Sequence, residues 1–79
     1  MIFSKRFRSE EHVRAFVIDK ADDRGWEVRE EQDDHVVKRT WMHDWHRVEN
    51  AILRFGLEAM QLQRAGWVEV PLRQVSNIV

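Results

Sequence analysis

Hydrophobic and polar positions follow their most regular pattern between Asp44 and Gly66. At 100° of rotation per residue, one side of this stretch is hydrophobic at spacings of three and four, which is typical of an amphipathic helix. The hydrophobic stripe contains Trp45, Val48, Ile52, Phe55, Ala59 and Leu62. Asp44 is a suitable N-cap, because its carboxylate can accept from free amides of the first turn. Gly66 is suited to end the helix in a left-handed conformation.

The same stretch carries a second hydrophobic stripe, formed by Leu53, Leu57 and Met60 and rotated by roughly 100° from the first. The remaining side is polar, with Arg47, Asn50, Arg54, Glu58, Gln61 and Arg64. A helix that lies on one sheet needs a hydrophobic arc of only about 100°. The excess packs under another helix of the chain, lies in a dimer interface, or lines a ligand groove. Gly56 interrupts the helix and indicates close packing or a hinge, since glycine there costs about 1 kcal/mol.

Residues 9–25 also have helical features. Ser9 can cap the start, and the hydrophobic face is Val13, Phe16, Val17 and Ala21. The run VRAFVI alone is also compatible with a buried strand, but the cap and the following ADDRG favour a helix. We therefore expect a first helix over residues 9–25, with Gly25 at its end.

Two strands joined by a turn are predicted next. Residues 26–31 alternate between hydrophobic and polar, residues 35–42 are β-branched and aromatic, and residues 32–34 are typical of a turn. Residues 67–70 resemble a third strand, which Pro71 ends. The buried face of the second strand is ambiguous between Val37, Arg39 and Trp41 and the alternate positions. The predicted fold class is α+β, a small two-layer domain of order α-β-β-α-β with two helices packed on a short antiparallel sheet.

The length of 79 residues predicts one domain, 1–79, in which 1–8 and 73–79 are the segments expected to be least ordered. The chain has no cysteine, so dimerisation is the obvious way to bury more surface than a small core allows. No hydrophobic run reaches the length of a membrane span, and the start lacks the hydrophobic segment of a secretory signal. We therefore expect a cytoplasmic protein that does not bind membranes.

Charge is distributed unevenly along the chain. Residues 1–8 carry +3, residues 9–35 carry −6 and residues 36–79 carry +2. A nucleic-acid-binding domain is normally basic as a whole, so this distribution does not favour that class. The separation of signs along the chain suits complementary contacts between molecules, or a solvated surface.

The candidate acid–base residues are His43, Asp44 and His46, because histidine titrates near neutrality and a carboxylate can orient it. A metal site needs three or four converging ligands, and this spacing matches no metal motif. No phosphate-binding loop or nucleophile pattern is present. A small enzyme is therefore kept as a further alternative, with no cofactor and no metal expected.

A basic and aromatic strand face supports a second alternative, a nucleic-acid-binding module. It would use Lys38, Arg39, Trp41 and Arg47. Such a face can stack bases and contact phosphates. The acidic preceding strand opposes this, since cross-strand ion pairs explain the same bases. Trp41 and Trp45, four residues apart, are expected to pack together where strand and helix meet, or to anchor an interface.

The predicted order of a helix, Gly25-Trp26, two strands and a second helix starting at Asp44-Trp45 is similar in layout to pterin-4a-carbinolamine dehydratases, over roughly residues 13–65. The resemblance implies a layered fold with the long helix across a sheet, in a protein that oligomerises. That family has a histidine-rich catalytic stretch after the long helix. Residues 61–70 here, QLQRAGWVEV, contain no histidine, so no activity or catalytic residue is transferred.

Together these patterns favour a non-enzymatic protein-interaction or regulatory module that acts as a homodimer. The expected interface residues are Leu53, Leu57, Met60 and Trp45. A different protein partner is the alternative occupant, because contiguous exposed hydrophobic patches are rare on monomers.

Overall fold

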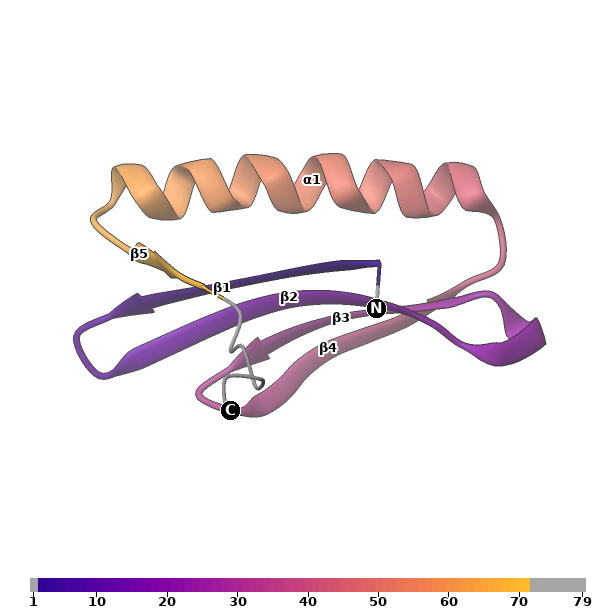
Figure 1. The fold of residues 1–79 in the computed structure, drawn as a ribbon, viewed down its shortest axis with the longest axis horizontal. Coiled ribbons are helices and arrows are strands. Elements are labelled where there is room, and N and C mark those ends of the chain that lie inside the picture. Colours follow the sequence, from indigo (N-terminus) through magenta and orange to yellow (C-terminus); the bar gives the residue numbers. More distant parts are fainter. Residues whose placement is uncertain (1, 72–79) are drawn as a thin grey trace, which may run out of the picture.

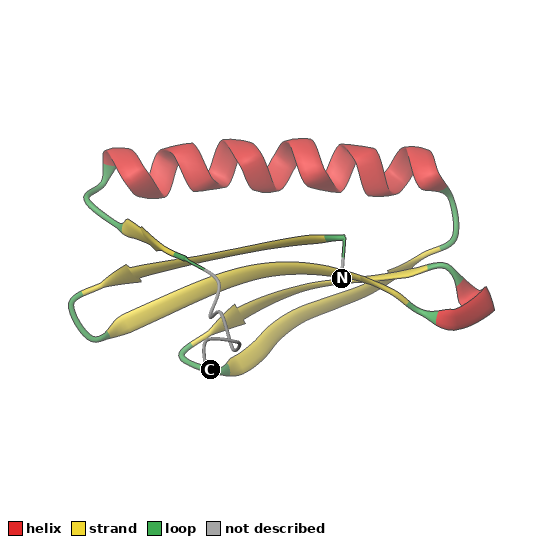
Figure 2. Ribbon diagram, in the orientation of Figure 1, coloured by secondary structure: helices red, strands yellow, loops and turns green. Residues whose placement is uncertain are grey.

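The computed structural model describes residues 2–71 and arranges them as one antiparallel sheet with one long helix across it (Figure 1). The elements are β1 (Phe3–Ser9), β2 (His12–Lys20), the short 3-10 helix η1 (Asp22–Arg24), β3 (Trp26–Gln32), β4 (His35–Met42), α1 (Trp45–Arg64) and β5 (Val68–Val70). The strand order is β4-β3-β2-β1-β5. Among the described residues, α1 forms the second layer, as Figure 2 shows. The predicted pair of helices on a short sheet, in the order α-β-β-α-β, is therefore wrong.

The error lies in residues 9–25, where a hairpin strand replaces the predicted first helix. β1 and β2 pair from Phe3↔Ile18 to Ser9↔His12, so Ser9, the predicted helix cap, is the last residue of β1, and Glu10 and Glu11 form the hairpin turn. Phe16 and Ile18 are fully buried beneath α1. Ala15 and Val17 alternate with them on the other face of β2 and are also buried. A strand buried on both faces has a continuous hydrophobic run, which periodicity alone cannot distinguish from a helix.

The predicted pair of strands after Gly25 is confirmed as β3 and β4, joined by a turn at Asp33 and Asp34, which both have positive φ. Met42 pairs with Trp26, and Thr40 pairs with Val28, which is in the core beneath α1. An irregularity between Glu30 and Glu31 then shifts the register. The alternation along β4 is broken at this bulge, and residues 35–41 are all exposed, so neither face of this strand is buried apart from the half-buried Met42.

The long helix and its caps are confirmed. The Asp44 carboxylate accepts from the backbone N–H of His46 at 2.9 Å, and Gly66 follows the helix with a φ of +101°. The side of α1 that faces the sheet is buried and consists of Val48, Ala51, Phe55, Ala59 and Leu62. The Phe55 ring lies 4.9 Å from that of Phe16, so the two layers meet around an aromatic centre.

Two connections complete the fold. Gly25 has a φ of +105°, and a Cβ atom there would collide with the carbonyl oxygen of Met42, so glycine is required between η1 and β3. After α1, β5 pairs with β1 and makes β1 an interior strand.

Two other predictions concern the chain end and the family resemblance. The prediction that residues 73–79 are among the least ordered falls outside the described residues. Because a strand precedes Gly25-Trp26 where the dehydratase layout has a helix, the resemblance in layout does not hold.

Candidate interaction surface

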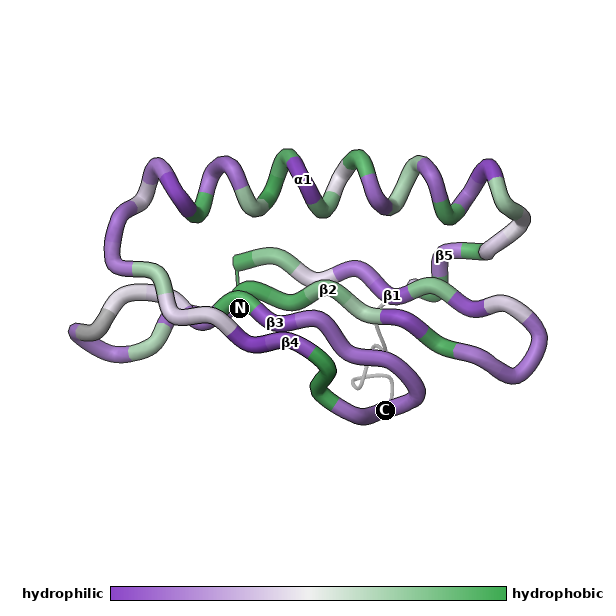
Figure 3. Tube along the Cα trace, turned by 180° about the vertical axis from the view of Figure 1, so that it is seen from behind, coloured by the Kyte–Doolittle hydropathy of each residue, from purple (hydrophilic) through white to green (hydrophobic). Residues whose placement is uncertain are grey.

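The second hydrophobic stripe of α1 lies on the side of the helix that faces away from the sheet. Leu53, Leu57 and Met60 are 67%, 61% and 50% exposed. On a helical wheel they lie about 165° from the centre of the buried side. Hydrophobic positions on the crests of α1 away from the sheet are visible in Figure 3. No other element of residues 2–71 covers this side, so the alternative that this stripe packs under a first helix does not occur there (Figure 1).

Trp45 lies at the N-terminal end of this surface. Its ring packs against Trp26 at 5.3 Å, yet the residue remains 43% exposed. With Glu49, Asn50, Ile52 and Leu53 it lines a shallow hollow that continues into the stripe. Trp41 is not its neighbour, because Trp41 pairs with Glu27 on β3. We call the surface formed by Leu53, Gly56, Leu57 and Met60 the outer face of α1.

Gly56 lies within this outer face. A Cβ atom placed on it would meet nothing within 4 Å. Close packing inside the described part of the chain therefore does not require glycine at this position. The helix nevertheless accepts the cost of a mid-helix glycine, about 1 kcal/mol relative to alanine.

The candidate acid–base residues do not form a site together. The Asp44 carboxylate is used as the helix cap, so it holds the backbone of His46 rather than an imidazole ring. His46 is 88% exposed and lies 3.6 Å from Glu49, and His43 is also exposed. Among residues 2–71, no three acidic or histidine side chains converge as metal ligands would. The cluster seen in the sequence is thus dispersed over an exposed helix start.

The basic and aromatic residues are divided between different surfaces. Arg39 and Trp41 share the sheet face that points away from α1, while Lys38 pairs with Glu30 on the face toward α1. Arg47 lies on α1 itself. Arg39 is also paired with Glu27, at 2.7 Å between Nε and Oε2. Only two of the four residues share one surface, and a carboxylate already neutralises one of these.

The open sheet face contains an ion network that was not predicted from the sequence. Arg29 Nη1 lies 2.9 Å from Asp19 and 3.0 Å from Glu27, and its Nε lies 2.7 Å from Glu31. The hydrogen bond to Glu31 raises the pKa of Arg29, against partial desolvation, and Asp19 raises it further. Glu27, Arg29 and Glu31 alternate along one strand face, which is a signal the sequence offered. The position of Asp19 could be found only by recognising β2 as a strand.

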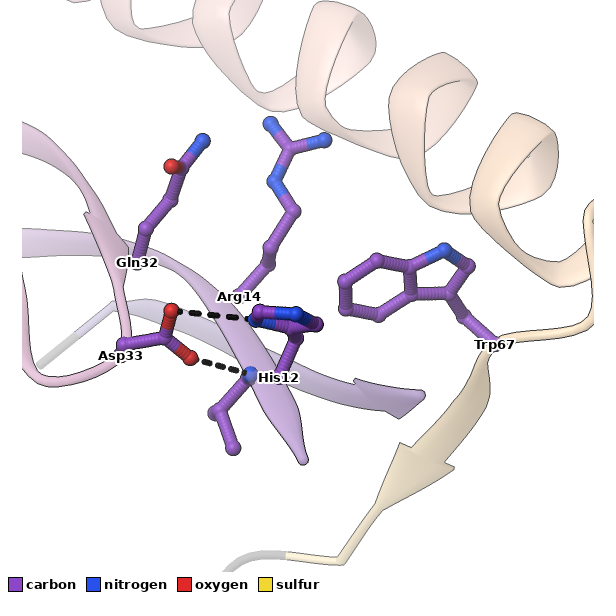
Figure 4. Close-up of a pocket in the computed structure, with 6 residues that line it drawn as sticks. His12, Arg14, Gln32, Asp33 and Trp67 are labelled. Carbon is purple, nitrogen blue, oxygen red and sulfur yellow. Dashed lines mark hydrogen bonds and ion pairs between the residues drawn. The ribbon is translucent and has the colours of Figure 1, made fainter. Parts of the chain in front are cut away.

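A small hollow of about 190 Å³ opens where the β3–β4 turn meets the start of β2 (Figure 4). The Asp33 carboxylate accepts from the Val13 backbone N–H at 2.9 Å, and its Oδ2 lies 3.3 Å from His12 Nδ1. The Val13 hydrogen bond, and then His12, lower the pKa of Asp33. Arg14 Nη2 lies 3.8 Å from Glu30 and 3.7 Å from Glu58. Each acid here lies near a base, because Asp33 is close to His12 and Arg14 lies between Glu30 and Glu58.

Comparisons with known proteins add no assignment. No protein-family model matches the chain, and no curated protein or solved structure shows significant similarity to it. Within residues 2–71, no helix combines the length and hydrophobicity needed to span a membrane. The chemistry of the described surfaces is therefore the basis for proposing a function.

Proposed function

We propose that this chain is a small non-enzymatic protein-interaction or regulatory module, and that it acts as a homodimer through the outer face of α1. One observation supports this above the others. Three large hydrophobic side chains, Leu53, Leu57 and Met60, are contiguous on the helix and at least half exposed. Contiguous exposed hydrophobic patches are rare on monomers, and where they occur they commonly mark interaction sites.

The size of the domain supports a second copy as the partner. A chain of 79 residues without cysteines has neither a large core nor disulfides to stabilise it. Burial of the outer face between two copies would remove from water hydrophobic area that the fold itself does not bury. Each Å² buried in this way stabilises the dimer by about 25 cal/mol.

The other candidate for self-association is the free edge of β4. Its exposed hydrophobic residues include Val36, Val37 and Trp41. Lys38 and Arg39 occupy the middle of the same edge, so pairing two copies there would bring like charges together. Charged residues on an edge strand are a recognised protection against edge pairing. The outer face of α1 has no such obstacle at its centre.

The nucleic-acid alternative has less support, because the ion pair with Glu27 occupies Arg39 and Lys38 faces the opposite side of the sheet. Heparin retention together with a salt titration of DNA or RNA binding tests it directly. Phosphate contacts would weaken binding steeply with salt. The enzyme alternative has less support still, because Asp44 serves as a cap.

The proposed function is tested by the absolute mass of the protein in solution, from light scattering after size exclusion over a wide concentration range. We expect the wild type to approach twice the mass of the 9.6 kDa chain at high concentration. Leu57→Glu should remain a folded monomer, because its side chain is already exposed and the charge opposes burial only at the interface.

Arg47→Glu is the matched control, since it introduces the same side chain at an exposed position of α1 outside the outer face. It should leave the mass unchanged, and circular dichroism should show that both variants are folded. A wild type that stays monomeric at the highest concentration would overturn the homodimer. Loss of dimer in both variants would place the interface elsewhere.

A further inference from the structure

Gly56 has no side chain, so it leaves a gap midway along the outer face, which we call the hollow. The residue lies one turn after Leu53 and one turn before Met60, and its backbone is flanked by open space. Its neighbour Leu57 projects from the same surface and is 61% exposed. On the outer face, the large side chain of Leu57 therefore projects next to the hollow at Gly56. A projecting side chain can pack into such a space on a second helix.

Opposite charges lie at the two ends of this surface. Glu49 lies toward the N-terminal end of α1 and is about half exposed, with His46 at 3.6 Å. Arg64 is exposed at the C-terminal end and has no ion pair within residues 2–71. Two such helices side by side in the same direction would oppose like charges. In opposite directions, each end would meet the other sign.

We propose that two copies of the chain pair through the outer faces of antiparallel α1 helices, with Leu57 of each copy seated over the partner's Gly56. A two-fold axis that passes between Gly56 and Leu57 produces this arrangement. Residues equally far before and after the axis then face one another. Leu53 meets the partner's Met60, and Glu49 meets the partner's Arg64. This inference rests on the proposed function and specifies its partner and register.

The spacing of the surface fits a shallow crossing of the two helices. Leu53, Leu57, Met60 and Arg64 follow spacings of four, three and four, the pattern of helices that cross at about 20°. Glu49 and Arg64 each lie about 11 Å from the axis along the helix. At 20° the helices separate little over that distance, and the two long side chains reach each other. At about 50°, the other common crossing, they would not.

A second copy is the occupant that these features select. A two-fold interface requires one surface to be complementary to itself. The outer face meets this requirement in three ways: a projecting leucine beside a hollow, two hydrophobic residues equally far from one axis, and opposite charges at equal distances. An unrelated partner would require none of these relations between residues of the same helix.

Charge reversal with rescue tests the register. Glu49→Arg should raise the dimer dissociation constant roughly tenfold, because the two-fold symmetry places the new repulsion against Arg64 at both ends of the interface. Arg64→Glu should weaken the dimer similarly. The double variant Glu49→Arg with Arg64→Glu should return the dissociation constant to near the wild-type value. Sedimentation velocity over a concentration series measures all four proteins, and thermal unfolding at low concentration separates any effect on the fold.

Cross-linking gives a second readout that does not depend on charge. The wild-type chain contains no cysteine, so introduced thiols can pair only with one another. In an oxidised mixture of Leu53→Cys and Met60→Cys chains, the antiparallel register predicts mostly mixed disulfide dimers, and mass spectrometry distinguishes these from like pairs. The register would be overturned if like pairs dominated, or if the double variant failed to restore the dimer. The proposed function would still hold in either case, provided that Leu57→Glu dissociates the dimer. A monomeric wild type would overturn both.

Discussion

Both sides of α1 carry hydrophobic residues, but the two sides lie in opposite environments. On the side toward the sheet, Phe55 and its neighbours are at most 8% exposed, whereas Leu53, Leu57 and Met60 on the outer face are 50% to 67% exposed. The difference shows that periodicity identifies the helix but not the purpose of each stripe. The sheet provides a partner for one side of α1. The other side keeps its hydrophobic residues without one, which points to a contact outside the described fold.

A matched pair of truncations tests whether the two sides of α1 differ in their contribution to folding. Phe55→Ala should lower the free energy of unfolding by about 3–5 kcal/mol, because it leaves a cavity among the rings of Phe3 and Phe16. Leu57→Ala should change it by no more than about 0.5 kcal/mol, since the side chain is exposed. Urea unfolding at a concentration where the protein is monomeric gives both values.

Self-association should respond in the opposite order. Leu57→Ala should weaken the dimer while the fold is unaffected, and any folded fraction of Phe55→Ala should still dimerise. If Leu57→Ala destabilised the monomer as strongly as Phe55→Ala, the outer face would belong to the core and the comparison would fail.

A smaller effect is expected at Gly56, with opposite signs for folding and association. Gly56→Ala should stabilise the monomer by about 1 kcal/mol, because alanine favours the helix and its Cβ meets open space. The same methyl group partly fills the hollow proposed to receive the partner's Leu57, so the dimer should weaken. Thermal unfolding of the dilute protein and sedimentation of the concentrated protein give the two values. A variant that gains in both would remove the reason for glycine here.

The sequence was sufficient for those elements whose signals are local. The Asp44 cap, the Gly66 terminus and the β3–β4 turn all depend on side chains or conformations within a few residues, and all were predicted correctly. Residues 9–25 were predicted wrongly, because the burial of β2 on both faces depends on β1 and β3 pairing with it from elsewhere in the chain. Burial on both faces removes the alternation by which a strand is recognised.

The candidate surface was predictable in part for the same reason. The exposed stripe of Leu53, Leu57 and Met60 follows from helical geometry alone, and its residues were identified. Its position directly opposite the core was not predicted, because the sequence left cover by a first helix, a dimer interface and a ligand groove as alternatives. The open space around Gly56 and the ion network at Arg29 depend on tertiary placement. The homodimer itself stays a prediction, because an unpaired surface describes only one half of a contact.

The smallest effect concerns a site on neither side of α1, and it separates the pH dependence of folding from that of association. The hydrogen bond from the Val13 N–H, and then His12, lower the pKa of Asp33 in the folded chain. A lowered folded pKa means that ionised Asp33 stabilises the fold above the ordinary aspartate range, and that this contribution is lost as the pH falls through the folded value. Stability of the monomer should therefore fall in acid.

Asp33→Asn tests this step with the turn geometry retained, because asparagine tolerates the positive φ of 52° and can still accept from Val13. The variant should be slightly less stable than the wild type at neutral pH, and the two should converge in acid. Because Asp33 lies in the β3–β4 turn and not on α1, the difference should be the same in dilute and concentrated protein. A difference that grew with concentration would mean that this turn also takes part in self-association, and that the outer face of α1 is not the whole interface.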